Sequence, residues 1–437
     1  MKYILIAFIL LLNSCSKPSL KNPQDALAYL DPATANQSIL SPLQAKLAYT
    51  NMLNNYYYPW NNKTLDLNKT KSLLREQIKN FTDKPGWNEN QQPHAIKWIN
   101  NIVNNMDLEN FPNHIQTAII IHDTNARIFP TQIPSYTDIH NPGEFYPFDN
   151  FQDSYIAAGT PVKIIHESRD KSWDFVLIEN SIFGDWIPAE DVAYVDDSFI
   201  KNWQNNLGYI AIRSDDIPLL NLHHHYYYKT RMGEIYPINK ISTNYLTLKI
   251  AVKNTDNNAV IQESEINKNT AYILPLITTP KNIAIIANQF INQPYGWGGL
   301  YGYRDCSSTT KNIFAYFGIW LPHASELQKE QGGLDINLAN LSDAQKQKII
   351  LEKAVPYFSL LYVPGHIVLY LGEKNNILYV FQDMWGLKTY RLFKPQGRIV
   401  IGKTVITPIT FGKECWNVPK TLLTKITDLI ILNGERT

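Results

Sequence analysis

The chain has 437 residues, a formal net charge of +1 and 18% charged residues. It contains no basic run of the length needed for nucleic-acid contact, so the composition argues against a nucleic-acid partner. Its hydrophobic content of 44% and aromatic content of 12% are typical of a folded globular protein. The length allows about two to four domains of ordinary size.

Residues 1–15 resemble a secretion signal. Lys2 precedes an apolar run, residues 4–12, that is too short to span a bilayer. The last residues of this segment resemble a bacterial lipoprotein signal, in which cleavage leaves Cys15 as a lipidated N-terminus; a plain secretory signal is the alternative. The resemblance implies a lipid anchor in the membrane on the periplasmic side, and Ser16 favours the outer membrane. No later apolar run could serve as a transmembrane helix.

Residues 16–36 are polar and contain three prolines, which predicts a tether between the membrane and the folded part. Residues 37–118 show apolar positions at helical spacing and are expected to form a helical segment without catalytic groups. The expected helices cover residues 43–53, 73–78 and 96–103.

The apolar period changes near Ile119, and short strands separated by turn residues follow. This pattern predicts two small all-β barrels, residues 119–200 and 201–276. Expected strands include residues 119–121, 161–166, 173–178, 184–188, 208–212, 246–252 and 271–274. His223 and His225 could share one strand face, but no third ligand is evident, so a metal site is not predicted.

Residues 277–437 mix helices and strands, so the whole chain is expected to be α+β. Within this part, a glycine-rich turn over residues 295–305 precedes Cys306, and apolar positions at helical spacing follow it. A thiol at a helix N-terminus meets free N–H groups and the positive end of the dipole, which favours thiolate. Cys306 is therefore a candidate nucleophile. The alternatives are a buried structural cysteine and a disulfide with Cys415.

A cysteine nucleophile needs a base and a group that orients the base. His366 opens an expected strand, and a second strand begins at Ile377. A symmetric hairpin loop centred on Lys374 would place His366 opposite Gln382, whose amide oxygen could accept from the imidazole. A shift of one residue would make Asp383 the orienting group instead. His366 taken alone could also be an ordinary strand-end histidine.

These motifs together resemble the NlpC/P60 family of papain-like cysteine peptidases. The resemblance covers about residues 280–410 through four boxes, and the helical segment with two SH3-like barrels is similar to multidomain members. The boxes are Tyr295-x-Trp297-Gly-Gly, Asp305-Cys306-Ser307, Gly365-His366-x-x-Leu-Tyr-x-Gly372 and Gln382-x-x-Trp385-Gly386.

The resemblance implies roles for single residues. Cys306 would be the nucleophile, His366 the general base and then acid, and Gln382 the orienting residue. Asp305 and Ser307 would receive the free amine of an N-terminal L-Ala. Tyr295, Trp297 and Ser325 would line the substrate groove. No metal or other cofactor is implied.

Two positions depart from the family pattern. Many relatives have histidine where this chain has Gln382, and glycine where it has Ser308. A neutral amide can fix the imidazole tautomer but adds no basicity, and serine should be tolerated in a helix that has already begun.

The implied activity is hydrolysis of the γ-D-glutamyl to L-diamino acid (diaminopimelate) bond in peptidoglycan stem peptides or released muropeptides. Two alternatives remain open at this point. One is a non-catalytic lipoprotein that binds peptidoglycan through its barrels, and the other is an amidase or acyltransferase that uses the same Cys-His pair.

Overall fold

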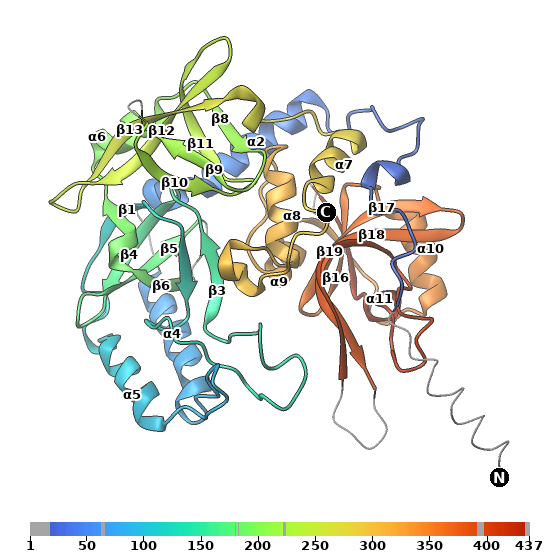
Figure 1. Cartoon of the computed structure of the whole chain (residues 1–437), viewed down its shortest axis with the longest axis horizontal. Coiled ribbons are helices and arrows are strands. Elements are labelled where there is room, and N and C mark those ends of the chain that lie inside the picture. The colour runs from blue at the N-terminus through green and yellow to red at the C-terminus, as the bar shows by residue number, and fades with distance from the viewer. Residues whose placement is uncertain are drawn as a thin grey trace.

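The computed structural model of the chain describes residues 18–62, 66–179, 181, 183–221, 224–390 and 397–432. The predicted lipidation site Cys15 and the strand residue His223 lie outside these ranges. Figure 1 shows the N-terminal helices and two all-β units on one side of the molecule and a mixed helix and sheet unit on the other.

Residues 18–36, which we call the strap, do not form a tether. Ala26 and Tyr29 are buried, at 0% and 7% exposure, in a 3-10 helix, η1, over Ala26–Tyr29. The Tyr29 ring lies 4.5 Å from the ring of Tyr379. The prediction failed because polar residues of the strap form specific hydrogen bonds: Gln24 donates to the Ile406 carbonyl at 2.8 Å and accepts from its N–H at 2.9 Å. The strap is thus part of the C-terminal domain.

The N-terminal helices lie where the apolar spacing predicts them. Trp60 donates from its indole N–H to the Ala118 carbonyl at 2.7 Å, and the Tyr57 hydroxyl lies 2.9 Å from that of Tyr209. These bonds join the helical segment to both all-β domains. The helices are α2 (Pro42–Tyr56), α3 (Tyr58–Asn61), α4 (Leu67–Thr82), α5 (Ile96–Asn105) and η2 (Leu108–Asn110).

The first all-β domain is a seven-stranded antiparallel sheet of order β3-β2-β6-β5-β4-β1-β7. It begins at Gln116 rather than at 119, because residues 116–119 pair with β4. A long connection, residues 128–151, joins β2 to β3. The strands are β1 (Gln116–Ile120), β2 (Thr124–Arg127), β3 (Gln152–Ile156), β4 (Pro161–Glu167), β5 (Trp173–Ile178), β6 (Gly184–Pro188) and β7 (Val192–Tyr194), with η3 (Ala189–Asp191) before β7.

The second all-β domain follows α6 (Asp197–Gln204), which crosses the predicted boundary at residue 200. It has a five-stranded sheet of order β13-β12-β11-β8-β14 and a β9-β10 ribbon. Its elements are β8 (Tyr209–Ile212), β9 (Ile217–Leu220), β10 (Tyr226–Thr230), β11 (Ile235–Ile241), β12 (Tyr245–Lys253), β13 (Ala259–Asn267), η4 (Lys268–Thr270) and β14 (Ala271–Ile273).

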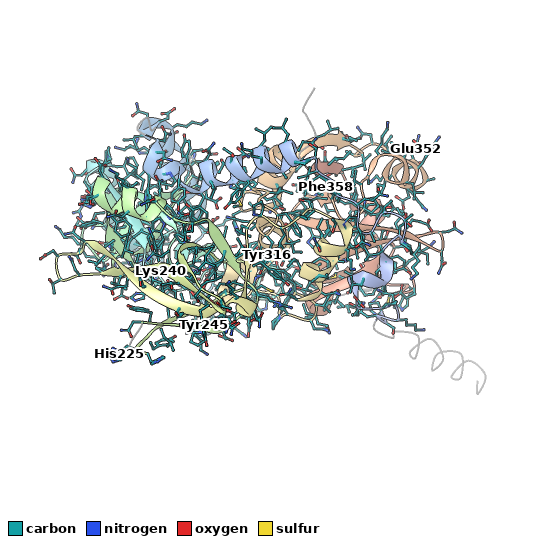
Figure 2. The ribbon with its side chains drawn as sticks, turned by 90° about the horizontal axis from the view of Figure 1, so that it is seen from above. His225, Lys240, Tyr245, Tyr316, Glu352 and Phe358 are labelled. Atoms are coloured by element: carbon teal, nitrogen blue, oxygen red, sulfur yellow. The ribbon has the colours of Figure 1, made fainter. Side chains whose placement is uncertain are left out.

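The C-terminal domain packs helices against an antiparallel sheet of order β15-β20-β16-β17-β18-β19. Figure 2 shows Tyr316 near the middle of the molecule, and its hydroxyl donates to the Ile212 carbonyl of the second all-β domain. The elements are α7 (Pro280–Asn288), η5 (Trp297–Gly302), α8 (Cys306–Ala315), α9 (Ser325–Gln331), β15 (Gly333–Asn337), α10 (Asp343–Lys353), β16 (Ser359–Val363), β17 (His366–Lys374), β18 (Ile377–Thr389), β19 (Gly397–Pro408), α11 (Leu422–Lys425) and β20 (Asp428–Leu432).

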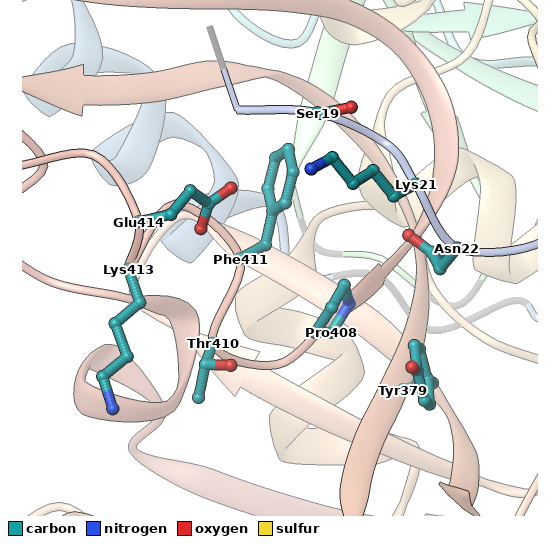
Figure 3. Close-up of a pocket in the computed structure, with 9 residues that line it drawn as sticks. All are labelled: Ser19, Lys21, Asn22, Tyr379, Pro408, Thr410, Phe411, Lys413 and Glu414. Carbon is teal, nitrogen blue, oxygen red and sulfur yellow. The ribbon is translucent and has the colours of Figure 1, made fainter. Parts of the chain in front are cut away.

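A pocket of about 580 Å³ lies where the strap meets the C-terminal domain. Figure 3 shows Lys21 and Asn22 of the strap facing Thr410, Phe411 and Glu414 across it. None of its lining residues belongs to the predicted catalytic or substrate-binding set. Within the ranges described, no helix has the length and apolar character of a membrane span.

Replacement of Tyr29 tests whether the strap is structural. Tyr29→Ala should lower the free energy of unfolding of the C-terminal domain by about 3 kcal/mol, because it removes a buried ring. Leu27→Ala, on the same short helix but at a side chain 38% exposed, should change it by less than about 0.5 kcal/mol. Urea unfolding measures both. If both variants left the free energy of unfolding almost unchanged, the interpretation of these residues as a tether would be restored.

Candidate active site

Cys306 is the first residue of α8, and Asp305 caps that helix. The Asp305 carboxylate accepts from the Ser308 N–H at 2.8 Å, and the Ser308 hydroxyl accepts from the Asp305 N–H at 2.8 Å. This reciprocal capping box explains why serine is favourable where relatives have glycine. It also fixes Cys306, which is 8% exposed, at the positive end of the helix.

His366 begins β17 and bonds to Gln382 of β18. The His366 Nε2 atom lies 2.9 Å from the Gln382 Oε1 atom, and the Gln382 amide donates to the Thr407 hydroxyl of β19 at 2.7 Å. Because the Gln382 amide N–H group donates to Thr407, the Gln382 amide oxygen faces the imidazole of His366. The Nε2 atom of His366 therefore carries the ring proton. Nδ1 is then the basic nitrogen.

The predicted register of the β17–β18 hairpin was wrong by two residues at Tyr370. Tyr370 faces Val380, not Leu378, because the turn is the two-residue Asn375-Asn376 with positive φ at both positions. The shorter turn shifts the pairing by three residues and a bulge after Tyr370 takes one back. A net shift of two leaves side chains on the same faces, so His366 still reaches Gln382 as a diagonal neighbour.

Asp383 is not the orienting residue. It points to the opposite face of β18, where the Thr309 hydroxyl of α8 donates to its carboxyl group at 3.3 Å. Burial and the neighbouring Asp305 raise the pKa of Asp383 well above its usual value.

The Cys306 sulfur lies at the start of β17, the strand that His366 begins, and burial acts on both groups. Burial, followed by the charge of Asp305, raises the pKa of the Cys306 thiol, although backbone N–H groups of Ile367 and Ser307 stabilise the thiolate. Burial lowers the pKa of His366, and Lys425 lowers it further. Desolvation and the nearby Asp305 carboxylate thus oppose the thiolate that the helix dipole favours. The hydrogen bond from Ile367 shows that the sulfur lies at the start of β17.

The predicted amine-binding residues already have partners. The Asp305 carboxylate accepts from the Ser307 hydroxyl at 3.0 Å and from the Gly298 N–H at 3.3 Å. Asp305 and Ser307 are both buried, at 8% and 3% exposure. Ser325 is half-buried and is the first residue of α9.

Tyr295 and Trp297 line the same side as Cys306. Burial raises the pKa of the Tyr295 phenol well above its usual value, and Cys306 is the neighbour with the largest further effect. The Tyr295 ring lies 6.0 Å from that of Trp385. The Trp297 indole donates to the Asp149 carbonyl of the first all-β domain at 3.0 Å. This bond joins the glycine-rich turn of the C-terminal domain to the first all-β domain.

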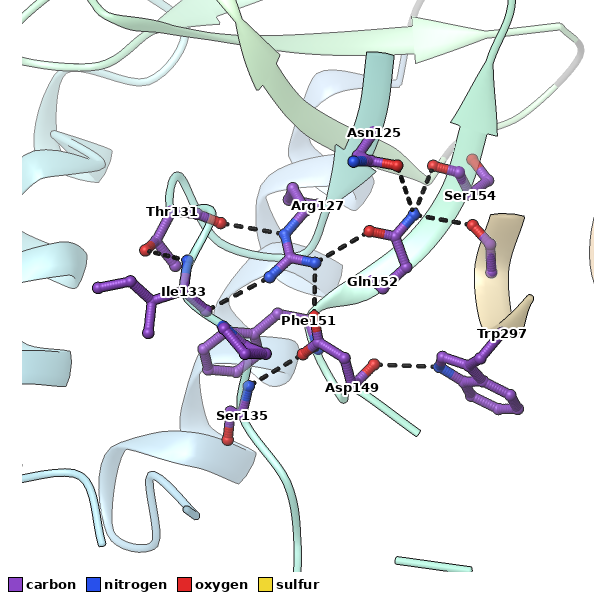
Figure 4. A network of polar contacts seen from close by, with 12 residues as sticks. Asn125, Arg127, Thr131, Ile133, Ser135, Asp149, Phe151, Gln152, Ser154 and Trp297 are labelled. Atoms are coloured by element: carbon purple, nitrogen blue, oxygen red, sulfur yellow. Dashed lines mark hydrogen bonds and ion pairs between the residues drawn. The ribbon is translucent and has the colours of Figure 1, made fainter. Parts of the chain in front are cut away.

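A buried ion pair holds the β2–β3 connection against the glycine-rich turn (Figure 4). Arg127 donates to the Asp149 carboxylate at 2.6 Å and to the Gln152 amide oxygen at 2.9 Å. Gln152 in turn donates to the Gly298 carbonyl at 2.8 Å. Arg127 and Asp149 have side chains only 2% and 3% exposed, so their attraction is little screened.

The second all-β domain holds the other end of this turn. Arg304, the residue before Asp305, donates to the Asp215 carboxylate at 2.8 Å and to the Met232 carbonyl at 2.9 Å. The sequence analysis did not single out Arg127, Arg304 or Thr407. Each acts through a partner distant in the chain, and no local pattern signals such a pairing.

Asp153 of β3 is another group that sequence reasoning missed. Its backbone carbonyl lies 3.0 Å from the Nε2 atom of His323, just before α9. Desolvation raises the pKa of its carboxyl group, and Asp305 is close enough to raise it further. The first all-β domain thus places a second carboxyl group near Asp305.

A buried cysteine at a helix start, with a histidine–amide pair on the adjoining sheet, defines a cysteine peptidase type of site. Family models agree along the chain. The matches are the NLPC_P60 stabilising domain over residues 4–111, an SH3 domain of SH3b1 type over 134–188, an SH3 domain of SH3b2 type over 196–241 and the NlpC/P60 family over 292–383. The chain therefore contains an NlpC/P60 domain after two SH3-type domains, which confirms the α+β fold with two SH3-like domains.

Solved structures include similar proteins. An NlpC/P60 endopeptidase from Photobacterium damselae subsp. piscicida is 27% identical, with a TM-score of 0.86, and the match covers 96% of this chain and 99% of that one. An NlpC/P60 family protein from Bacillus cereus is 14% identical, with a TM-score of 0.48 and coverage of 72% and 98%. The comparison with curated proteins gives no match. The family and the first of these structures support a peptidase.

Two further observations concern the disulfide and the metal site that the sequence analysis considered. Cys306 and Cys415 are not joined by a disulfide. Among the residues that the structure describes, no three histidine, cysteine or acidic side chains gather as metal ligands would.

The raised pKa of the Cys306 thiol predicts how this residue reacts with iodoacetamide. Because its pKa is raised above 9.0, the thiolate fraction at neutral pH is small and grows about tenfold per pH unit. Alkylation of Cys306, followed by peptide mass spectrometry, should therefore be slow near pH 7 and accelerate above pH 9. His366→Ala should change the neutral rate little. A fast plateau below pH 7 that His366→Ala removes would instead demonstrate a resting ion pair.

Proposed function

We propose that the protein hydrolyses the γ-D-glutamyl to L-diamino acid bond of muropeptides that carry a free N-terminal L-Ala, with Cys306, His366 and Gln382 as its catalytic groups. The observation that carries this proposal is the Gln382–His366 hydrogen bond at 2.9 Å beside the buried Cys306. It supplies a nucleophile, a base with a fixed tautomer and an orienting amide.

The reaction begins with proton transfer. The thiol proton of Cys306 passes to Nδ1 of His366 as the sulfur attacks the γ-carbonyl carbon. N–H groups in the first turn of α8 and the positive end of its dipole stabilise the oxyanion. His366 then protonates the leaving amine, and the C–N bond breaks to give a thioester. Water, deprotonated by His366, hydrolyses the thioester and restores the thiol.

The acyl side of the groove supports recognition of a free amine. Asp305 and Asp153 present two carboxyl groups at this end, and an ammonium ion between them would relieve their repulsion. The β2–β3 connection closes the same end through Asp149 and Gln152. Such a closed end suits a short peptide terminus better than a continuing chain.

Three variants test the catalytic roles on L-Ala-γ-D-Glu-diaminopimelate. Cys306→Ala should abolish release of L-Ala-D-Glu, and His366→Ala should lower kcat by about 1000-fold or more. Gln382→Ala should lower kcat only about 10- to 30-fold, the effect of one buried hydrogen bond. Mass spectrometry follows the product. Equal losses in the last two variants would contradict the assigned roles.

Thr407→Val provides a positioning control for the same experiment. It removes the acceptor of the Gln382 amide, so the amide can turn and kcat should fall with KM unchanged. Intact substrate with reduced wild-type protein would sink the hydrolase proposal. If Cys306→Ala protein still bound peptidoglycan as wild type does, the wall-binding alternative would take its place. Transfer of the acyl group to an added amine would favour the acyltransferase alternative.

We also propose that Cys15 is lipidated and anchors the protein to the periplasmic side, in the outer membrane. The signal-like segment motivates this proposal, and the strap, which packs on the C-terminal domain from residue 18, would keep the peptidase close to the lipid surface. Cys15→Ser should move the protein from the membrane fraction to the soluble fraction on cell fractionation. An unchanged distribution would exclude the lipid anchor.

A further inference from the structure

Two exposed aromatic side chains lie close together on the C-terminal domain. The structure describes all ten tryptophans of the chain, and Trp416 alone among them is exposed, at 65% of its surface; the other nine are buried or half-buried. Tyr390, 55% exposed, lies beside it, because its N–H group donates to the carbonyl of Asn417 at 2.7 Å. Neither ring contributes to the core of the domain.

The loop that carries Trp416 has an ordered backbone and is packed against the strap. Val418 donates from its N–H group to the Cys415 carbonyl at 3.0 Å, which closes a turn around Trp416. Phe411 and Val418 of this loop pack with Leu20 of the strap in one hydrophobic cluster. The loop therefore holds the Trp416 ring out into solvent, an unfavourable place for a large apolar surface unless a partner covers it.

The charged side chains around this loop are mostly cationic. Within residues 18–22 and 408–420 the charged residues, all of them exposed, are Lys21, Lys413, Glu414 and Lys420. No ion pair between described residues includes any of the four. Figure 3 shows Lys21 of the strap and Lys413 of the loop on either side of the pocket between these segments. An excess of positive charge thus surrounds the two aromatic rings.

The start of the strap brings this surface close to the proposed lipid anchor. Pro18, the first residue that the structure describes, is buried, and Leu20 packs against the loop. Cys15 precedes Pro18 by three residues, and a chain of this length spans at most about 11 Å. A lipid on Cys15 would therefore keep the membrane surface next to the strap and the loop.

We propose that an anionic phospholipid surface covers this region. The membrane face, as we call it, consists of Lys21, Tyr390, Lys413, Trp416 and Lys420. The inference rests on the lipid anchor of the proposed function and adds a second contact to it. The aromatic rings would enter the headgroup region, where their apolar bodies meet acyl chains and their polar edges meet water. The lysines would face the headgroup phosphates. Two contacts fix the orientation of the peptidase on the membrane, which a lipid alone would not.

The test uses the mature full-length chain with Cys15→Ser, which carries no lipid, and vesicles of phosphatidylethanolamine and phosphatidylglycerol. Cosedimentation should show binding that weakens about 10-fold or more from low to high salt, because salt screens the lysine–headgroup attraction. Replacing Lys21, Lys413 and Lys420 together by glutamine should lower the partition coefficient about 100-fold, or about fivefold per lysine. Trp416→Ala should lower it about 10-fold, because the membrane then buries one aromatic ring less.

The matched control removes the same charge from another surface. Lys46, Lys79 and Lys97 are exposed on α2, α4 and α5, and their replacement by glutamine should leave vesicle binding almost unchanged. Glu414→Gln should act in the opposite direction and strengthen binding about fivefold, because it removes the one acid beside the membrane face. Equal losses in the two triple variants would indicate a response to net charge alone and would overturn the inference.

Fluorescence tests the insertion of Trp416 directly. Brominated phospholipids in the same vesicles should quench part of the tryptophan emission, and Trp416→Phe protein should lack that part. Failure to bind the vesicles, or binding that Trp416→Ala leaves unchanged, would refute the membrane face. The lipid anchor fails or holds separately, since a high-salt wash of cell membranes releases a docked protein and retains a lipidated one.

Discussion

The geometry of the active site depends on how the turn before Cys306 is held between the two all-β domains. The turn has little regular structure, and Gly298 and Gly299 have φ of +53° and +82°. A Cβ on Gly299 would lie 2.3 Å from the Cβ of Tyr155, so the glycine is needed for the first all-β domain to approach. A flexible turn would let α8 drift. Gln152 at one end and Arg304 at the other remove that freedom.

This arrangement shows that the SH3-like domains contribute to the geometry of the active site. The buried Arg127–Asp149 pair lies in the first of them, yet it orients the carbonyl that receives the Trp297 indole. Breaking a buried pair leaves an uncompensated charge, which is strongly destabilising. The catalytic domain therefore depends on contacts that lie more than a hundred residues away in sequence. The turn before Cys306 is thus held by contacts from both all-β domains.

The raised pKa of the Cys306 thiol follows from burial of the sulfur. Asp305 is required as the helix cap, so a thiolate would be desolvated beside the negative charge of this carboxylate. Substrate binding changes this balance. An ammonium near Asp305 would offset its charge and favour the thiolate at the moment of attack. In the proposed function, selection of a free amine and activation of the nucleophile would then share one cause.

Local sequence patterns predicted the elements, the place of Cys306 at a helix start and the pairing of His366 with Gln382, but not the contacts between distant segments. Helical and alternating periodicity located α2, α5, β4 and β5 because one face of each is buried. The wrong hairpin register did no harm to the His366–Gln382 pairing, because a two-residue shift preserves side-chain facing. Polar segments gave no such signal. The strap and the β2–β3 connection look like linkers in composition, and their order comes from side-chain hydrogen bonds to distant backbone.

The strap contributes to the site through β19. Gln24 and Asn22 bind the backbone of Ile406, the residue before Thr407. Thr407 fixes the Gln382 amide, and that amide fixes the His366 tautomer. A change in the strap can therefore reach the base through one strand without touching the cleft. Since the strap begins directly after the predicted lipidation site, the part of the chain nearest the membrane would also be the part that steadies the proton acceptor.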